Sequence, residues 1–364
     1  MIGDIFRNHG DAYIEAHESN IPLKHVKVIR AIQRCKTSAC GVNVSACREC
    51  GRVHSTYRSC GDRNCPVCQH RNNLKWLDKR LGDQLPGPYF MITFTIPEEL
   101  RSIVRSAQGD AYGALFRASS TTLKELIANP KHVGGDTPGF FGVLHTWGRQ
   151  LQYHPHIHYV VPGGALRKRD RTWVRAREGF LVPVHALSKV FRGKFRDEAR
   201  RLGLERLVAP DVWRKAWNVN SQYVPGGAEG TLKYLAPYVF RPGITNARIV
   251  AVDDDEVTFK YKKSKSRRWR TITLNVFEFI RRFLQHVLPT GFMKIRYYGF
   301  MGAGNSVPHE ELAILIEIAH DFQVRRPKRS KPPETPTMRC PKCGGELKLA
   351  FMRIGEVTIR FDTG

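Results

Sequence analysis

The expected fold rests on the stretch Tyr153-His154-Pro155-His156-Ile157-His158-Tyr159-Val160-Val161. Its alternation of polar and apolar residues, followed by an apolar β-branched run, predicts a β-strand. Residues two apart in a strand face the same side, so His156 and His158 would present imidazoles about 7 Å apart along it. Such a pair favours one divalent metal, with Ile157 facing a core on the other side. A strand with surface histidines is the alternative.

Strand and helix patterns alternate around this stretch. Residues 140–147 read as a strand just before it, which predicts an antiparallel hairpin, and residues 89–96 read as a buried strand. Helices are expected over 1–34 with a break near 20–22, and over 72–85, 111–128, 185–202, 208–218 and 275–288. The expected fold class is therefore α+β with a central, mostly antiparallel sheet.

The charge of the chain is strongly positive. Lys and Arg number 59 against 33 Asp and Glu, a formal net charge of +26 in 364 residues. This excess predicts a polyanionic partner, with nucleic acid as the first candidate and an anionic membrane surface as the second. No apolar run has the length of a membrane span, and the first residues lack a secretory pattern. We therefore expect an intracellular protein that uses its cysteines as metal ligands or free thiols.

Two C-x2-C knuckles lie in a cysteine-rich stretch over residues 35–68. They are Cys47–Cys50 and Cys65–Cys68, separated by a 14-residue gap. Paired thiolates at this spacing predict one tetrahedral four-cysteine site for structural Zn²⁺. Cys60 could replace one of the four ligands or join a second site.

A third knuckle, Cys340–Cys343, follows a basic and proline-rich linker over 325–336. Two thiolates cannot complete a zinc site, so its partners must come from elsewhere in the chain. The cysteines left over for this role are Cys35, Cys40 and Cys60.

Two tyrosines stand four residues apart in the segment 229–241. In a helix, Tyr234 and Tyr238 would project from one face, although Pro237 removes a backbone donor between them. Packing of both rings in a core is the ordinary interpretation of such a pair. The alternative is that their hydroxyls act as nucleophiles.

Two basic stretches are candidates for contacts with nucleic acid. The second arm of a hairpin expected over 247–274 interleaves cations with aromatic rings, a pattern that suits phosphate contacts and base stacking. Its candidate DNA-binding residues are Lys260, Lys262, Lys263, Lys265, Arg267, Arg268, Trp269 and Arg270. A loop adds Arg167, Lys168 and Arg169. A merely solvated edge strand is the alternative for the hairpin.

Together these features fit one reaction. A tyrosine hydroxyl can attack a DNA phosphate and form a covalent 5′-phosphotyrosine bond. A divalent ion held by His156 and His158 would polarise that phosphate and stabilise the developing charge. A second tyrosine would allow a second strand transfer. The candidates for a third metal ligand are His154, His145 and Gln150.

The chain resembles the HUH-superfamily transposases of bacterial rolling-circle insertion sequences, in the two-tyrosine branch with an N-terminal zinc-binding domain. The resemblance rests on the cysteine stretches 35–51 and 59–69, on His154-Pro155-His156-Ile157-His158 with 161–164, and on Tyr234-Leu235-Ala236-Pro237-Tyr238 with 244–249. Pro237 and Asn43 depart from the family pattern, standing where a basic residue and a histidine are expected.

The resemblance implies an RRM-like or ferredoxin-like HUH core that carries the histidines centrally, with an N-terminal helical and zinc-ribbon domain. It implies that His156 and His158 bind Mg²⁺ or Mn²⁺, with His154 as a further candidate, and that Tyr234 and Tyr238 are nucleophiles. The expected substrate is single-stranded DNA at hairpin-bearing element ends, cut and rejoined in the bacterial cytoplasm at the nucleoid. No membrane partner is expected.

The expected domains are a helical and zinc-binding domain over 1–85, a catalytic domain over 86–322 that includes the hairpin 247–274, and a linker with the C-terminal knuckle over 323–364. Three other functions fit the same sequence features. A plasmid replication initiator or relaxase would use the same chemistry. A non-catalytic zinc-ribbon DNA-binding protein would form no covalent adduct, and a metal-dependent hydrolase would cut without one.

Overall fold

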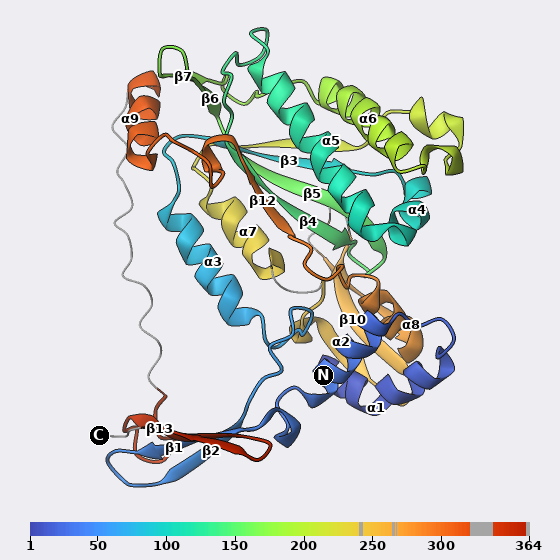
Figure 1. Cartoon of the computed structure of the whole chain (residues 1–364), viewed down its shortest axis with the longest axis vertical. Coiled ribbons are helices and arrows are strands. Elements are labelled where there is room, and N and C mark those ends of the chain that lie inside the picture. Colours follow the sequence, from blue (N-terminus) through green and yellow to red (C-terminus); the bar gives the residue numbers. More distant parts are fainter. Residues whose placement is uncertain (240–242, 264–265, 267, 321–337, 362–364) are drawn as a thin grey trace. The chain divides into compact units, whose positions relative to one another are not determined.

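The computed structural model describes residues 1–239, 243–263, 266, 268–320 and 338–361 (Figure 1). The chain forms two compact units. The ribbon unit comprises residues 1–75, 240–287 and 328–364, and the sheet unit comprises 76–239 and 288–327. These units do not coincide with the boundaries expected at 85/86 and 322/323. The hairpin 247–274, expected in the catalytic domain, groups instead with the N-terminal segment. The reason is that the helix after this hairpin, α8 (Val276–Leu284), packs on the first helix of the chain, α1 (Ile2–Ala16).

The sheet unit is built on a five-stranded antiparallel sheet with the order β12-β4-β5-β3-β8. The strands are β3 (Tyr89–Thr95), β4 (Phe140–Trp147), β5 (Tyr153–Pro162), β8 (Val219–Val224) and β12 (Ile295–Tyr298). Helix α5 (Gln108–Ala128) connects β3 to β4, and helix α6 (Val184–Arg201) lies between β5 and β8 in the sequence. The histidine strand β5 is the central strand of the sheet. It pairs antiparallel with β4, which confirms the predicted hairpin of residues 140–147 with the histidine strand.

Helices α5 and α6 cover one face of this sheet (Figure 1). The apolar side chains of β3, β4 and β5 that face these helices form the main core, which includes Phe94, Ile157, Tyr159 and Phe191. Ile157 is fully buried, as its position between the two histidines predicts. The histidines therefore lie on the opposite face, where α7 (Glu229–Val239) lies (Figure 1).

Truncation of Ile157 in this core should destabilise the sheet unit. We expect Ile157→Ala to lower the free energy of unfolding by about 2–5 kcal/mol, because the methyl and methylene groups removed leave a cavity between β5 and the helices. Urea unfolding followed by tryptophan fluorescence would measure the change. Val250→Ala is the control, since Val250 lies on an exposed edge of the other unit and its truncation should leave the midpoint unchanged.

The remaining elements of the sheet unit are α4 (Arg101–Ser106), the two-stranded β6 (Gly164–Arg167) and β7 (Thr172–Arg175), and α9 (His309–His320). Helix α3 (His70–Gly82) begins in the ribbon unit and continues into this one. The helix expected over 208–218 is wrong. Only the short 3-10 helix Pro210–Trp213 forms there, because Trp213 and Trp217 turn inward and pack against each other, and Trp217 also packs against the aromatic rings of α6.

The ribbon unit contains helices α1 (Ile2–Ala16) and α2 (Leu23–Arg34) and a four-stranded sheet with the order β14-β13-β1-β2. Its strands are β1 (Val42–Cys47), β2 (Val53–Tyr57), β13 (Leu347–Ile354) and β14 (Val357–Arg360). A second sheet holds β9 (Ile249–Val252), β10 (Glu256–Lys262) and β11 (Trp269–Asn275), followed by α8 (Val276–Leu284). Phe6 on α1 packs edge-on against Phe283 on α8, with ring centroids 5.0 Å apart. Among the described residues, no helix has the length and apolar character needed to cross a membrane.

Candidate active site and metal centres

Three imidazoles meet on the face of the central sheet opposite α5 and α6. His145 on β4 pairs directly with His156 on β5, and His158 follows two residues later on the same face of β5. Nitrogen atoms of the three rings lie within 4.8 Å of one another, so one metal ion could contact all three. We call His145, His156 and His158 the histidine cluster.

Hydrogen bonds orient the rings of this cluster. The Nδ1 atom of His156 lies 2.7 Å from the carbonyl oxygen of His154, and a carbonyl only accepts, so Nδ1–H must donate. This tautomer leaves the Nε2 lone pair of His156 for a metal. His158 Nδ1 lies 2.9 Å from the hydroxyl oxygen of Thr93, the residue opposite it on β3. Both strands that flank β5 therefore support the cluster.

Burial keeps the cluster uncharged. It lowers the pKa of His145 and His156 well below their usual value, with a smaller contribution from the neighbouring imidazoles, and it lowers the pKa of His158 to about 4. All three rings are thus neutral near pH 7 and keep a lone pair for a cation. Three neutral nitrogen donors suit a divalent ion, which supports the metal site predicted from the strand pattern.

His154, a further candidate ligand, lies outside the histidine cluster, although its ring centroid is 5.2 Å from that of His156. The pairing of β4 with β5 shifts by one residue between His145 and Trp147, so β5 carries a bulge at this point. Pro155 lies at the bulge, where its missing backbone donor is tolerated. The ring of His154 is instead held by Arg101, whose guanidinium lies 2.9 Å from Nδ1.

Tyr234 lies on α7 with its ring facing the cluster. The ring centroids of Tyr234 and His158 are 6.1 Å apart, and the tyrosine is 52% exposed. The opposite face of α7 is the buried one, and it carries Leu232, Leu235 and Val239. Core packing is therefore not the role of Tyr234. Helix α7 extends through position 237, and Tyr238 lies within it, but the side chain of Tyr238 is outside the described residues.

The cysteines form two clusters rather than the single site expected from two neighbouring knuckles. The first cysteine cluster contains Cys35, Cys60, Cys65 and Cys68, whose sulfurs all lie within 4.8 Å of one another. The sulfur of Cys35 is 3.5 Å from that of Cys68 and 3.6 Å from that of Cys65, and the sulfur of Cys60 is 3.5 Å from that of Cys68. Four sulfurs about 2.3 Å from a zinc ion would lie about 3.8 Å from one another, so the cluster has the size of a tetrahedral zinc site. These distances also exclude disulfides.

The second cysteine cluster contains Cys47, Cys50, Cys340 and Cys343. The prediction that Cys47 and Cys50 share a site with the knuckle Cys65–Cys68 is therefore wrong. The physical reason is that β13 pairs with β1 and brings the C-terminal knuckle against the first one, a long-range contact that spacing alone does not reveal. Cys40 belongs to neither cluster.

The basic hairpin formed by β10 and β11 exposes one aromatic ring between cations. Trp269 is 54% exposed, and the ammonium groups of Lys260 and Lys262 lie 5.6 and 4.9 Å from its ring centroid. The opposite face is buried, because Phe259 packs against Phe279 of α8. The further candidates Lys263, Arg268 and Arg270 are exposed, whereas Lys265 and Arg267 lie outside the described residues.

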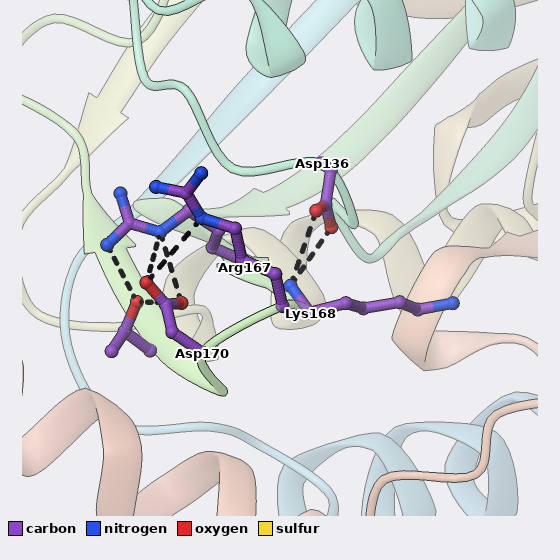
Figure 2. A network of polar contacts seen from close by, with 6 residues as sticks. Asp136, Arg167, Lys168 and Asp170 are labelled. Atoms are coloured by element: carbon purple, nitrogen blue, oxygen red, sulfur yellow. Dashed lines mark hydrogen bonds and ion pairs between the residues drawn. The ribbon is translucent and has the colours of Figure 1, made fainter.

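The basic loop between β6 and β7 is partly neutralised within the protein (Figure 2). The guanidinium of Arg167 donates to Asp170 at 2.8 Å and lowers the pKa of that carboxyl to about 2. The backbone N–H of Lys168, not its ammonium, donates to Asp136. Arg169 has a side chain that is 81% exposed and lies 4.0 Å from the carboxylate of Asp170, farther than Arg167 does. Arg169 and Lys168 are therefore better placed for phosphate contacts than Arg167.

Two site residues were not assigned from the sequence alone. Thr93 lies within a buried strand, and its side chain gives no sign of a functional role in the sequence. Its position opposite His158 in the pairing of β3 with β5 is the signal that identifies it. His145 was one of three candidates for the third ligand, and only the register of β4 against β5 singles it out. Cys35, Cys340 and Cys343 had no assigned partners, because their contacts cross 30 residues or more.

Three neutral imidazoles that could bind one metal ion lie beside an accessible tyrosine. Enzymes that act on DNA phosphates can use such an arrangement. Comparison with known families agrees. A model described as "Transposase zinc-binding domain" matches residues 5–96, and one described as "Putative transposase" (Y2_Tnp) matches residues 139–308. The second match includes the histidine cluster and Tyr234.

Two relatives cover most of the chain. "Putative transposase y4qJ" of Sinorhizobium fredii is 39% identical over 322 residues, which are 83% of this chain and 80% of the relative. The "Transposase for insertion sequence element IS801" of Pseudomonas savastanoi is 26% identical over 297 residues, which are 76% and 70% of the two chains. No solved structure matches significantly. The chain belongs to the transposases of IS91-type insertion sequences and so acts on DNA.

Proposed function

We propose that this transposase nicks and rejoins single-stranded DNA at the ends of its insertion sequence through a covalent 5′-phosphotyrosine bond, moving the element by a rolling-circle-like mechanism. One observation carries the proposal: the accessible ring of Tyr234 lies beside the buried, uncharged His158 of the histidine cluster. A nucleophile and a cation site on adjacent elements are the two parts that phosphoryl transfer requires.

In the proposed first step, the hydroxyl oxygen of Tyr234 forms a bond to the scissile phosphorus while the bond from phosphorus to the 3′ oxygen breaks. The phenol loses its proton, and the 3′ oxygen takes one up as the leaving hydroxyl. The reverse step uses a 3′-hydroxyl to attack the phosphotyrosine and releases the tyrosine. Tyr238, four residues along α7, would serve as the second nucleophile.

His145, His156 and His158 would hold Mg²⁺ or Mn²⁺. When bound, such an ion polarises the scissile phosphate and offsets the charge that develops on it. Thr93 and the carbonyl of His154 orient two of the imidazoles, and burial keeps the rings neutral. Tyr234 is held by a helix whose other face is buried, so its ring is positioned before DNA arrives.

We also propose that the sheet unit has the RRM-like or ferredoxin-like core of HUH enzymes. The elements β3-α5-β4-β5-α6-β8 follow the order strand-helix-strand-strand-helix-strand, and the sheet order β4-β5-β3-β8 is antiparallel throughout. The proposed substrate is an element end that can form a hairpin, in the bacterial cytoplasm at the nucleoid. The relatives favour a transposase over a replication initiator or relaxase of the same chemistry.

The test is a single-stranded DNA that carries the element end, incubated with the protein and Mg²⁺ or Mn²⁺. We expect a protein–DNA band that survives a denaturing gel and disappears when the metal is chelated. Cut DNA without such a band would indicate a hydrolase that activates water. Binding with neither cleavage nor adduct would indicate a non-catalytic DNA-binding protein. Either result would refute the proposed mechanism.

The basic hairpin of the ribbon unit should contribute to DNA binding. We expect Trp269→Ala to weaken binding of single-stranded DNA by about 1–3 kcal/mol through the loss of a base-stacking surface. Lys262→Ala should make the salt dependence of binding shallower by roughly 0.7 in the log–log slope. Fluorescence anisotropy at several salt concentrations would measure both effects.

The matched control is Val250→Ala, which alters an exposed residue of the same three-stranded sheet without removing charge or an aromatic ring. Equal affinities of the Trp269→Ala variant and the wild type would assign this hairpin the role of a solvated edge.

A further inference from the structure

We propose that the two ends of the chain jointly bind a second zinc ion through the second cysteine cluster. Its ligands would be Cys47 and Cys50 from the N-terminal segment and Cys340 and Cys343 from the C-terminal one. The family match to a zinc-binding domain ends at residue 96, so it does not include the C-terminal pair. This site is separate from the first cysteine cluster, with which it shares no ligand.

The sulfur positions suit a tetrahedral zinc ion. Cys47 and Cys343 have sulfurs 3.4 Å apart, and Cys50 and Cys340 have sulfurs 3.8 Å apart. Four sulfurs about 2.3 Å from one zinc ion would lie about 3.8 Å from each other. Two thiolates come from each segment, so neither segment can complete the site alone.

The two knuckles have the same backbone structure. In the first, the N–H of Gly51 donates to the carbonyl of Cys47 at 3.1 Å, and the N–H of Cys47 donates to Arg52 at 2.9 Å. In the second, Gly344 donates to Cys340 at 2.9 Å, and Cys340 donates to Gly345 at 2.8 Å. Each turn is closed by a glycine in the left-handed region, with φ of 66° at Gly51 and 77° at Gly344. Two equivalent C-x2-C-G turns facing each other are a typical zinc-ribbon arrangement.

The four-stranded sheet of the ribbon unit holds the C-terminal knuckle next to the N-terminal one. Strand β13 pairs with β1 up to Leu347 opposite Cys47, and the N–H of Arg48 donates to the carbonyl of Glu346 at 3.1 Å. At the other end of β1, Gly41 has a φ of 87°, and a Cβ there would lie 2.3 Å from the carbonyl oxygen of Arg353. The start of β1 is therefore shaped to accept the backbone of β13.

A histidine contacts one of the four cysteine ligands. His54 on β2 has its Nε2 atom 3.3 Å from the sulfur of Cys340. An N–H donated to a thiolate ligand stabilises its negative charge and orients it, as second-layer groups do in other metal sites. This neighbour comes from the N-terminal segment and acts on a C-terminal ligand, so the segments depend on each other beyond the metal itself.

Metal analysis of the full chain tests the proposal. We expect about two zinc ions per chain, one for each cysteine cluster. The double variant Cys340→Ser, Cys343→Ser should retain about one, held by the first cysteine cluster. Cys40→Ser is the matched control and should retain about two, because Cys40 belongs to neither cluster. Cys343→His should also retain about two, since imidazole is an alternative zinc ligand.

A measurement on the wild type removes any dependence on the folding of the variants. Zinc bound to Cys340 and Cys343 should slow their alkylation at least about tenfold relative to chelator-treated protein, because metal-bound thiolates are poor nucleophiles. Mass spectrometry of the digested protein would give the rate for each cysteine. Equal rates with and without chelator at these two residues, or an unchanged zinc content in the double serine variant, would overturn the proposal.

Discussion

The variant His156→Ala should lose strand cleavage by more than about 100-fold while keeping most of its affinity for single-stranded DNA. Loss of groups that merely orient a metal ligand commonly costs 10–100-fold, so loss of a ligand itself should cost more. His156 is half-buried on the central strand, and its Nδ1–H is committed to a backbone carbonyl, which leaves its Nε2 for a metal. The measurements are cleavage rates across a range of Mn²⁺ concentrations and Mn²⁺ affinity by calorimetry.

Two companion variants make this result specific. His145→Ala should behave like His156→Ala, because His145 supplies the third ring of the cluster. His154→Ala is the matched control on the same strand, and its activity should stay within about tenfold of the wild type, because its Nδ1 is engaged by Arg101 and it is not one of the three cluster imidazoles. The reverse pattern, with His145→Ala active and His154→Ala inactive, would make His154 the third ligand. Loss of DNA binding by His156→Ala would indicate a role in folding or direct contact instead.

The variant Tyr234→Phe should lose formation of the covalent adduct by at least about 1,000-fold, since removal of a catalytic nucleophile usually costs more than that. Phenylalanine keeps the ring that lies 6.1 Å from that of His158, so only the hydroxyl is tested. The readout is the amount of DNA-linked protein on a denaturing gel. Tyr223→Phe, on strand β8 of the same unit, is the control and should form the adduct normally.

The second tyrosine can be separated from the first. If Tyr238 acts in the later transfer, Tyr238→Phe should still cut and form an adduct but should fail to complete joining. Mass spectrometry of the trapped peptide would identify the linked tyrosine. An adduct that persists in the double variant Tyr234→Phe, Tyr238→Phe would show that another residue is the nucleophile.

The sequence predicted most of what depends on short-range periodicity. The alternation His156-Ile157-His158 correctly assigned one residue to the core and two to the opposite face, because facing parity in a strand is local. Parity also made His154 a candidate, and its ring does lie 5.2 Å from that of His156, but parity could not show which imidazole of a neighbouring strand joins His156 and His158. The third imidazole became identifiable only when the pairing partner of His156 was known.

Features that depend on long-range pairing were not predictable in this way. Cysteine spacing indicated knuckles correctly but assigned their partners wrongly, because Cys50 and Cys340 are 290 residues apart. Tyr234 could not be distinguished from a core residue until the buried face of α7 was known. The grouping of the basic hairpin with the N-terminal helices likewise depends on side-chain packing between α1 and α8, such as Phe6 on Phe283.

The turn that joins β4 to β5 has a consequence for any work that alters the length of the chain. Its backbone is closed by Gly148, which donates to Gln152 at 2.8 Å, and by Leu151, which is fully buried in a left-handed conformation. Surface hairpin turns usually accept inserted tags or epitopes. Here one added residue that slipped the pairing would carry His145 to the opposite side of the sheet. The length of the turn over 148–152 is therefore as much a requirement for the histidine cluster as the identity of its three imidazoles.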